Sequence, residues 1–105
     1  MIYELRIYQM HDGKMEDICN RFKNYTLKYF PKYGIKVTNF WVDADGKNAL
    51  YYICEFENRE KMAAAWENFN IAPEWVEAKS KSNAAGPTVV NVQSFVMENA
   101  DFFTK

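Results

Sequence analysis

Three polar residues near the start of the chain have the types and the spacing to bind a ligand. Glu4, Arg6 and Tyr8 alternate with apolar residues, so in a β-strand their side chains share one face. An arginine beside a tyrosine hydroxyl can receive an anionic or carbonyl group. The simpler interpretation, which we favour, is a structural ion pair between Glu4 and Arg6 that fixes the register at a subunit interface.

Four further residues are candidates for lining a ligand cavity, because they lie on other predicted strands. They are Trp41, Tyr51, Asn91 and Gln93. Trp41 is equally suited to be the central packing ring of a dimer. Alternation divides each strand into two faces, but it does not show which face lines an interior.

The sequence contains no recognisable metal or cofactor motif. His11 is the single histidine, and its neighbour Asp12 suggests an oriented general base, although a loop histidine is the commoner arrangement. One histidine and two distant cysteines, Cys19 and Cys54, do not make a zinc site. Both cysteines fall at predicted core positions, so we expect them to be reduced. We expect neither a metal nor a cofactor.

Composition limits the class of protein. The chain has 105 residues and a formal net charge of −1, which supports one domain over residues 1–105 and excludes the broad basic surface of sequence-independent nucleic-acid binding. No stretch approaches the roughly 20 apolar residues of a membrane span. The charged start lacks the apolar run of a signal peptide, so we expect a cytoplasmic protein. Aromatic residues reach 17%, which is a large apolar surface for one small core.

Periodicity predicts the elements that must position these residues. Residues 2–10 alternate as a half-buried strand, and apolar residues recur at helical spacing from Met15 to Tyr33. We expect Asp12 to cap this long helix and Gly34 to end it.

The rest of the chain continues with a predicted hairpin. Residues 36–43 and 48–56 are rich in β-branched and aromatic residues, and Asp45-Gly46 between them favours a tight turn. The remaining elements are, in order, a helix capped by Asn58, a short helix from Pro73, a polar loop over 79–87, a strand over 88–97 and a tail at 101–103 that packs against the domain.

This β-α-β-β-α-β order indicates an α+β fold of the ferredoxin-like kind, an antiparallel sheet with both helices on one face. Both alternate sets of the 36–43 strand are apolar, with Val37 and Trp41 on one face and Phe40 and Val42 on the other. A sheet that is apolar on both faces needs a second cover, and the economical cover is a second copy. We therefore predict a homodimer whose sheets enclose a shared interior.

The first strand places charges inside that dimer on one condition. If Leu5 and Ile7 face the helices, then Glu4 and Arg6 point into the shared interior. Buried charges need partners, so these two would pair with each other, with the second subunit or with a ligand.

Several segments, taken in order, resemble the NIPSNAP family. Tyr3-Glu4-Leu5-Arg6-Ile7-Tyr8 followed by Gly13-Lys14 is similar to the first strand and turn of that family. The further matches are Gly34-Ile35-Lys36 leading to Phe40-Trp41, Glu57-Asn58-Arg59-Glu60, Ala65-Trp66-Glu67-Asn68-Phe69 running into Pro73-Glu74-Trp75, and Asp101-Phe102. Their order and spacing together are specific over nearly the whole chain.

The resemblance implies a dimeric α+β barrel of the stand-alone, bacterial type, and it implies no defined activity. We expect a homodimer with a small-molecule pocket in the barrel interior. The wider superfamily contains cofactor-independent oxygenases and isomerases, so the alternative function is such an enzyme acting on a small aromatic or quinone-like substrate. Trp66 stands near the place where antibiotic-type monooxygenases carry a histidine. The opposing hypothesis is a non-catalytic module whose interior is filled by side chains.

Overall fold

Four antiparallel strands form the sheet in the computed structural model, which describes residues 1–84 and 86–103. Their order is β2–β3–β1–β4, so β1 and β3 are central and the other two are edge strands. β1 pairs with both β3 and β4 over most of its length. These four strands confirm the four that the sequence predicts. Their bounds are β1 (Ile2–Met10), β2 (Lys36–Val42), β3 (Ala49–Phe56) and β4 (Val89–Met97).

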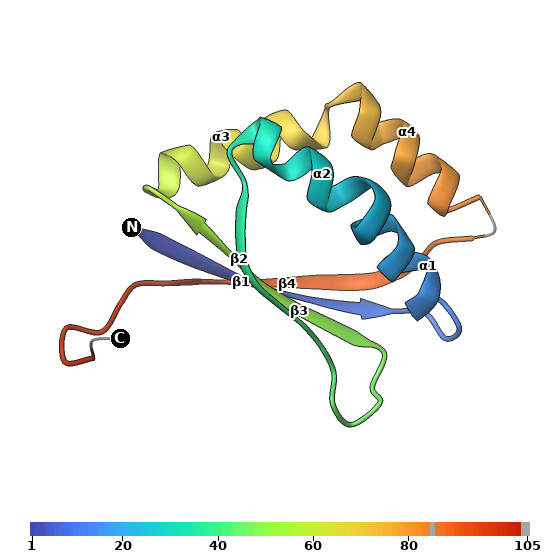
Figure 1. Ribbon diagram of the computed structural model, residues 1–105, viewed down its shortest axis with the longest axis horizontal. Helices are drawn as coiled ribbons and strands as arrows, with labels where there is room; N and C mark the ends of the chain where they lie inside the picture. The colour runs from blue at the N-terminus through green and yellow to red at the C-terminus, as the bar shows by residue number, and fades with distance from the viewer. Residues whose placement is uncertain (85, 104–105) are drawn as a thin grey trace.

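Helices cover one face of the sheet and leave the other face open (Figure 1). The element order and the sheet order confirm the ferredoxin-like α+β fold. Within the described residues, no helix has both the length and the apolarity needed to cross a bilayer. The helical segments are α1 (Met15–Arg21), η1 (Phe22–Thr26), α2 (Leu27–Tyr29), η2 (Phe30–Tyr33), α3 (Arg59–Asn70) and α4 (Pro73–Ser82).

The first predicted helix is interrupted. It starts at Met15 as expected, but its middle turn, η1, is a π-helix and its last turn, η2, is a 3₁₀-helix. Thr26 Oγ1 donates to the carbonyl of Arg21 at 3.3 Å, five residues earlier, which fits the wider π-helical turn. Gly34 ends the run in the left-handed conformation at φ 79°, as predicted.

Two expectations about helix ends need correction. Asp12 does not cap α1; its carboxylate accepts from the Asn48 side-chain amide at 3.1 Å and so joins the two turns instead. The polar loop predicted from Lys79 begins only after Ser82, because α4 continues to that residue. Its polar residues lie on the solvent side, while Trp75 and Ala78, three positions apart, are buried. By contrast, the predicted cap of α3 is confirmed, since Asn58 accepts from the Lys61 N–H at 2.9 Å.

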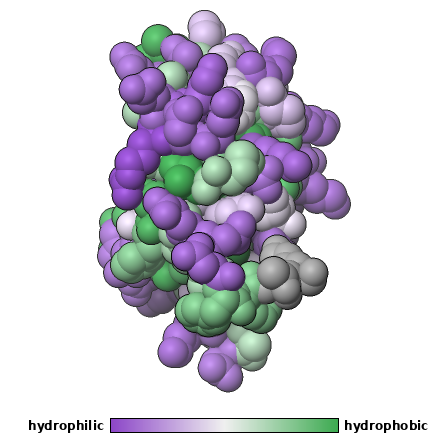
Figure 2. All heavy atoms as spheres, turned by 90° about the vertical axis from the view of Figure 1, so that its left-hand side faces the viewer, coloured by the Kyte–Doolittle hydropathy of each residue, from purple (hydrophilic) through white to green (hydrophobic). Residues whose placement is uncertain are grey.

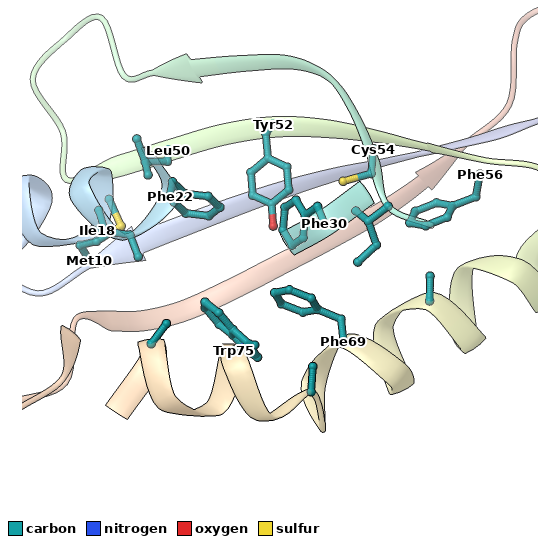
Figure 3. Packing of buried hydrophobic residues seen from close by; sticks show 14 of the residues in the cluster. Met10, Ile18, Phe22, Phe30, Leu50, Tyr52, Cys54, Phe56, Phe69 and Trp75 are labelled. Atoms are coloured by element: carbon teal, nitrogen blue, oxygen red, sulfur yellow. The ribbon is translucent and has the colours of Figure 1, made fainter. Parts of the chain in front are cut away.

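The core lies between the sheet and the helices and is largely aromatic (Figure 3). Phe22, Phe30 and Phe40 surround Tyr52 of β3 with ring centroids 5.1 to 6.2 Å apart. Cys54, on the same face of β3, is fully buried, and burial together with the nearby Glu4 charge raises the pKa of its thiol to about 12. Both cysteines are free thiols, as expected, although Cys19 is only half-buried.

The sheet face opposite the helices is apolar and uncovered on this chain. In the strand register Leu5 lies between Ile53 and Phe95, and Trp41 lies at the edge beside Tyr51. Trp41 is 48% exposed and Phe95 is 47% exposed. The prediction that both faces of this sheet carry apolar residues is therefore confirmed. The predicted division of β2 is wrong, because an irregularity between Val37 and Asn39 puts Val37 with Phe40 on the helix side and leaves Trp41 on the open face.

The C-terminal tail does not pack as predicted. Phe102 is 93% exposed and Phe103 is 66% exposed. Both rings line a groove with Tyr3, Ile53 and Met97 at one end of the open face. The groove leaves most of the surface of the two rings exposed. Hydrophobic side chains gather on the surface at this end of the molecule (Figure 2).

A leucine pair tests where the core lies. Leu50 is fully buried between sheet and helices, whereas Leu27 is 39% exposed. We expect Leu50→Ala to lower the free energy of unfolding by about 3 kcal/mol, because it leaves a cavity, and Leu27→Ala to change it by less than about 1 kcal/mol. Urea denaturation followed by circular dichroism measures both, and equal losses would contradict this placement of the core.

Candidate functional site

The polar face of β1 points toward the helices. The Trp66 indole N–H of α3 donates to the Glu4 carboxylate at 2.6 Å, and the Tyr8 ring packs edge-on against Phe22 at 5.5 Å. Leu5 and Ile7, which alternate with these residues, therefore lie on the open face. The condition under which Glu4 and Arg6 would point into a dimer interior is not met, because the helix layer itself supplies a hydrogen-bond donor for the buried carboxylate.

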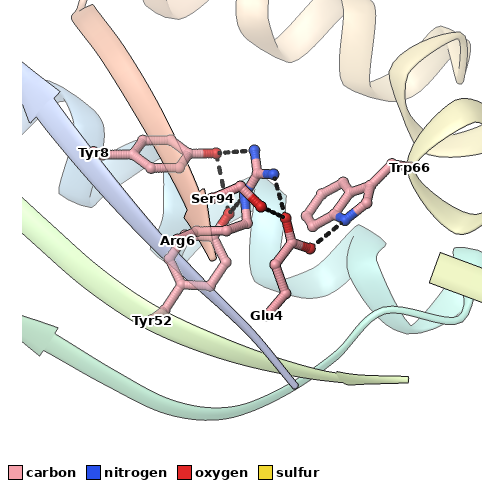
Figure 4. Close-up of polar contacts among 6 residues, drawn as sticks. All are labelled: Glu4, Arg6, Tyr8, Tyr52, Trp66 and Ser94. Carbon is pink, nitrogen blue, oxygen red and sulfur yellow. Dashed lines mark hydrogen bonds and ion pairs between the residues drawn. The ribbon is translucent and has the colours of Figure 1, made fainter. Parts of the chain in front are cut away.

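Glu4 is the hub of the site (Figure 4). Its side chain is 3% exposed, yet both carboxylate oxygens have donors. Oε1 accepts from Trp66, while Oε2 accepts from the Ser94 hydroxyl at 2.5 Å and from Arg6 Nη1 at 3.2 Å. Side chains of β1, β4 and α3 thus meet on one negative charge. A buried ion pair is tolerated when all of its polar atoms have hydrogen-bond partners, as both oxygens of Glu4 do.

Arg6 continues the network toward two tyrosines. Its Nε donates to the Tyr52 hydroxyl at 2.9 Å and its Nη2 to the Tyr8 hydroxyl at 3.4 Å. The Tyr52 hydroxyl in turn donates to the Tyr8 hydroxyl at 3.0 Å. The guanidinium also stacks on Trp66, with Cζ 4.1 Å from the ring centroid, which fixes its orientation.

The electrostatics keep Arg6 charged and Tyr52 protonated. Burial lowers the pKa of Arg6, but Tyr52, Tyr8 and Glu4 outweigh it, and the pKa stays above its usual value. Burial, followed by the proximity of Tyr8, raises the pKa of Tyr52 well above its usual value, against the opposing effect of Arg6. The site therefore presents to the cavity a permanent cation, Arg6, and the Tyr8 hydroxyl, which accepts from the protonated phenol of buried Tyr52.

A cavity of about 410 Å³ opens beside this network, between the sheet and the helices. Its aromatic wall consists of Tyr8, Trp66, Phe69 and Trp75, and the last two rings stack at 4.8 Å. The remaining lining residues are Arg6, Arg21, Asn70, Lys79, Asn83 and residues 87–92. The cavity combines aromatic walls with a few convergent polar groups, as small-molecule sites generally do.

Arg21, at the end of α1, is a lining residue that the sequence reasoning missed. It is 4% exposed, and its Nη1 donates to the Ser82 hydroxyl at 3.0 Å. Its guanidinium lies over Trp75, with Cζ 5.2 Å from the ring centroid. Burial lowers its pKa. A signal existed in the sequence, because Arg21 stands between Ile18 and Phe22 on the apolar stripe of the helix.

The structure divides the sequence candidates between the two faces. Glu4, Arg6 and Tyr8 form the network, whereas Asn91 borders the cavity but pairs with Gln9 of β1, on the same face of β4 as Gln93. Trp41, Tyr51 and Gln93 align on the open face in register with Ile7 of β1, and the Tyr51 hydroxyl donates to Asp43 at 2.5 Å. Tyr52, Trp66 and Ser94 complete the network, and they were missed because only the strand register and helix packing bring them to Arg6 and Glu4. Exposed His11 is not among the residues that line the cavity.

Removing the charge of the hub is expected to destabilise the fold. Glu4→Gln leaves Arg6 buried without its carboxylate, so the free energy of unfolding should fall by about 3 kcal/mol. The double variant Glu4→Gln/Arg6→Met should recover a large part of this loss, because it removes both charges. Exposed Glu67→Gln on α3 is the matched control, and urea denaturation measures all three. A single Glu4→Gln variant as stable as the control would contradict the role of the hub.

Comparisons with known proteins agree with this architecture. A structure of an uncharacterized NIPSNAP domain protein from Burkholderia xenovorans matches with a TM-score of 0.83 and 18% identity, covering 100% of both chains. A NIPSNAP family protein of unknown function from Agrobacterium tumefaciens matches with a TM-score of 0.84 and 15% identity, covering 98% of this chain and 91% of that one. At these identities the likeness concerns the fold.

A more distant structure shares the same fold. An antibiotic biosynthesis monooxygenase matches with a TM-score of 0.68 and 10% identity, covering 95% of this chain and 99% of that one. No curated protein matches this chain. The NIPSNAP family model matches residues 3–103. The chain therefore belongs to the NIPSNAP family.

Proposed function

We propose that this protein binds a small organic molecule in the cavity between its sheet and its helices. The observation that carries the proposal is the pair Arg6 and Tyr8 at the wall of a cavity of about 410 Å³, both hydrogen-bonded to the buried Tyr52 hydroxyl. The Arg6 side chain is 18% exposed, so a ligand can reach its donors. By comparison, a second hollow of about 460 Å³, between Leu27 and Val37, has one charged side chain, Lys36, among its described lining residues.

The lining suggests the chemistry of the ligand. The face of Trp66 is already occupied by Arg6, but Phe69 and Trp75 offer a stacked aromatic surface to a planar body. An oxygen of that body near Tyr8 would accept hydrogen bonds from the tyrosine hydroxyl and from Arg6. A planar aromatic ketone, phenol or quinone satisfies both requirements.

A second candidate function is a cofactor-independent oxygenase or isomerase for such a compound. Arg6 and the Tyr8 hydroxyl would stabilise the oxyanion that the bound compound forms when it transfers a proton to a water molecule, in a cavity partly shielded from solvent. The shared fold of an antibiotic biosynthesis monooxygenase gives this candidate its support. Turnover of the compound in air, followed by its absorbance, distinguishes an enzyme from a binding protein.

The working unit is proposed to be a homodimer that buries the open sheet face. Leu5, Ile7 and Ile53 occupy its middle, and Trp41 and Phe95 are about half exposed at its sides. A second sheet packed face to face would remove these apolar groups from water. The exposed rings of the tail lie beside the same face and would gain a contact in such a pair.

The proposed ligand site predicts a difference between two tyrosines. Tyr8 lines the cavity, whereas Tyr51 lies on the opposite face of the sheet. We expect Tyr8→Phe to weaken binding of 1-naphthol or 1-tetralone about tenfold by removing a donor, and Tyr51→Phe to leave it unchanged. Quenching of tryptophan fluorescence reports binding, because Trp66 and Trp75 line the cavity. Equal effects of the two variants, or no binding to the wild type, would refute the site.

The proposed dimer predicts a difference between two exposed apolar residues. Phe95 lies on the open sheet face, whereas Val76, 52% exposed, lies on α4 in the helix layer. We expect Phe95→Glu to convert a dimer into a folded monomer and Val76→Glu to leave the dimer intact, because only the first buries a charge at the interface. Sedimentation velocity measures the mass. A monomeric wild type at micromolar concentration would overturn the proposal.

A further inference from the structure

Arg21 is a buried cation without a negative partner. Within the described part of the chain no carboxylate forms an ion pair with it, and the Ser82 hydroxyl is its one hydrogen-bond partner. Its Nε is buried and has no acceptor at all. An uncompensated buried charge costs free energy of folding. A fold that retains such a charge therefore favours the binding of an anion beside it.

The geometry of the guanidinium shows where that anion would bind. Nη1 is held by Ser82 of α4, and the flat face rests on Trp75. Among the described residues neither Nε nor Nη2 has an acceptor, and together they form the edge that arginine uses to bind a carboxylate with two parallel hydrogen bonds. Because Nε is itself buried, Nη2 is the donor that a ligand reaches first, on a guanidinium oriented in advance.

The charges around the cavity favour an anion as well. Arg6, Arg21 and Lys79 line it, and no Asp or Glu is among its described lining residues. The negative charge nearest to Arg6, on Glu4, is already fully engaged with Arg6, Trp66 and Ser94. A cavity with an excess of positive charge and low-dielectric walls concentrates anionic ligands.

The helix that carries Arg21 has an unusual conformation directly after it. The π-helical turn η1 begins at Phe22, and Thr26 bonds back to the Arg21 carbonyl. Single π-turns cost stability and occur frequently at functional sites. The irregular turn thus coincides with Arg21, which no carboxylate among the described residues neutralises.

We infer that the ligand of the cavity is an organic carboxylate, and that Arg21 binds its carboxylate group while the Arg6–Tyr8 end receives the rest of the molecule. This inference rests on the proposed function and narrows it to planar aromatic acids. Arg21 and Arg6 come from α1 and β1, on different walls of one cavity, so the ligand bridges the helix layer and the sheet.

The test compares benzoate with benzamide, which has the same shape and no charge. We expect the wild type to bind benzoate at least about tenfold more tightly than benzamide. Arg21→Met should lose this preference and leave benzamide binding unchanged, and Arg21→Lys should retain part of it. Exposed Arg59→Met is the matched control. Titrations followed by tryptophan fluorescence, together with the side-chain Nε–H resonances of ¹⁵N-arginine, detect binding even at millimolar affinity.

A second readout requires no ligand. Because Arg21→Met removes an unpaired buried charge, its ligand-free melting temperature should equal or exceed that of the wild type, whereas a purely structural arginine would lower it. A lower melting temperature together with unchanged benzoate binding would overturn the inference.

The outcomes separate this inference from the proposed function. Equal binding of benzoate and benzamide by the wild type overturns the carboxylate assignment and leaves the cavity as a binding site. Tighter binding of inorganic phosphate than of benzoate also overturns it. Failure of the wild type to bind benzoate, benzamide, 1-naphthol and 1-tetralone overturns the proposed function itself.

Discussion

The architecture of this protein depends on the burial of one carboxylate. Glu4 lies under the helix layer, where an ionised group is tolerated only if both of its oxygens have donors. Those donors are Arg6 of β1, Ser94 of β4 and Trp66 of α3. The carboxylate therefore ties α3 to the two strands and orients Arg6, whose remaining donors reach the tyrosines at the cavity wall.

The same arrangement explains why the two faces of the sheet differ. Because the polar alternates of β1 are turned toward the helices, Leu5 and Ile7 are left for the open face, beside Ile53 and Phe95. The helix side becomes a polar network within an aromatic core, and the open side becomes a face with an apolar middle that also carries Gln93 and Glu55. One face is thereby suited to recognising a ligand and the other to packing against a second sheet.

The sequence predicted the elements well and the faces poorly. Alternation, a left-handed glycine at Gly34 and the Asn58 cap are local signals, so the strands and most helix ends could be placed from neighbouring residues alone. The face of β1 could not, because it depends on whether the helix layer supplies a donor, here Trp66, for Glu4. Tyr52 joins the site through strand register, which no local pattern encodes, whereas Arg21 could have been found from its place on the apolar stripe of the helix. The predicted packing of Phe102 and Phe103 against the domain was wrong. An apolar side chain favours burial, but the sequence does not show which surface buries it.

The central claim is that the ligand site lies between the sheet and the helices and not between two sheets. A high-resolution crystal structure of protein purified without added ligands, or soaked with a planar aromatic acid, tests it most directly. We expect electron density for a flat molecule in the cavity, within hydrogen-bonding distance of Tyr8 at one end and of Arg21 at the other. A cavity that holds only water, with the ligand found against Trp41 and Tyr51 on the open face, would contradict it.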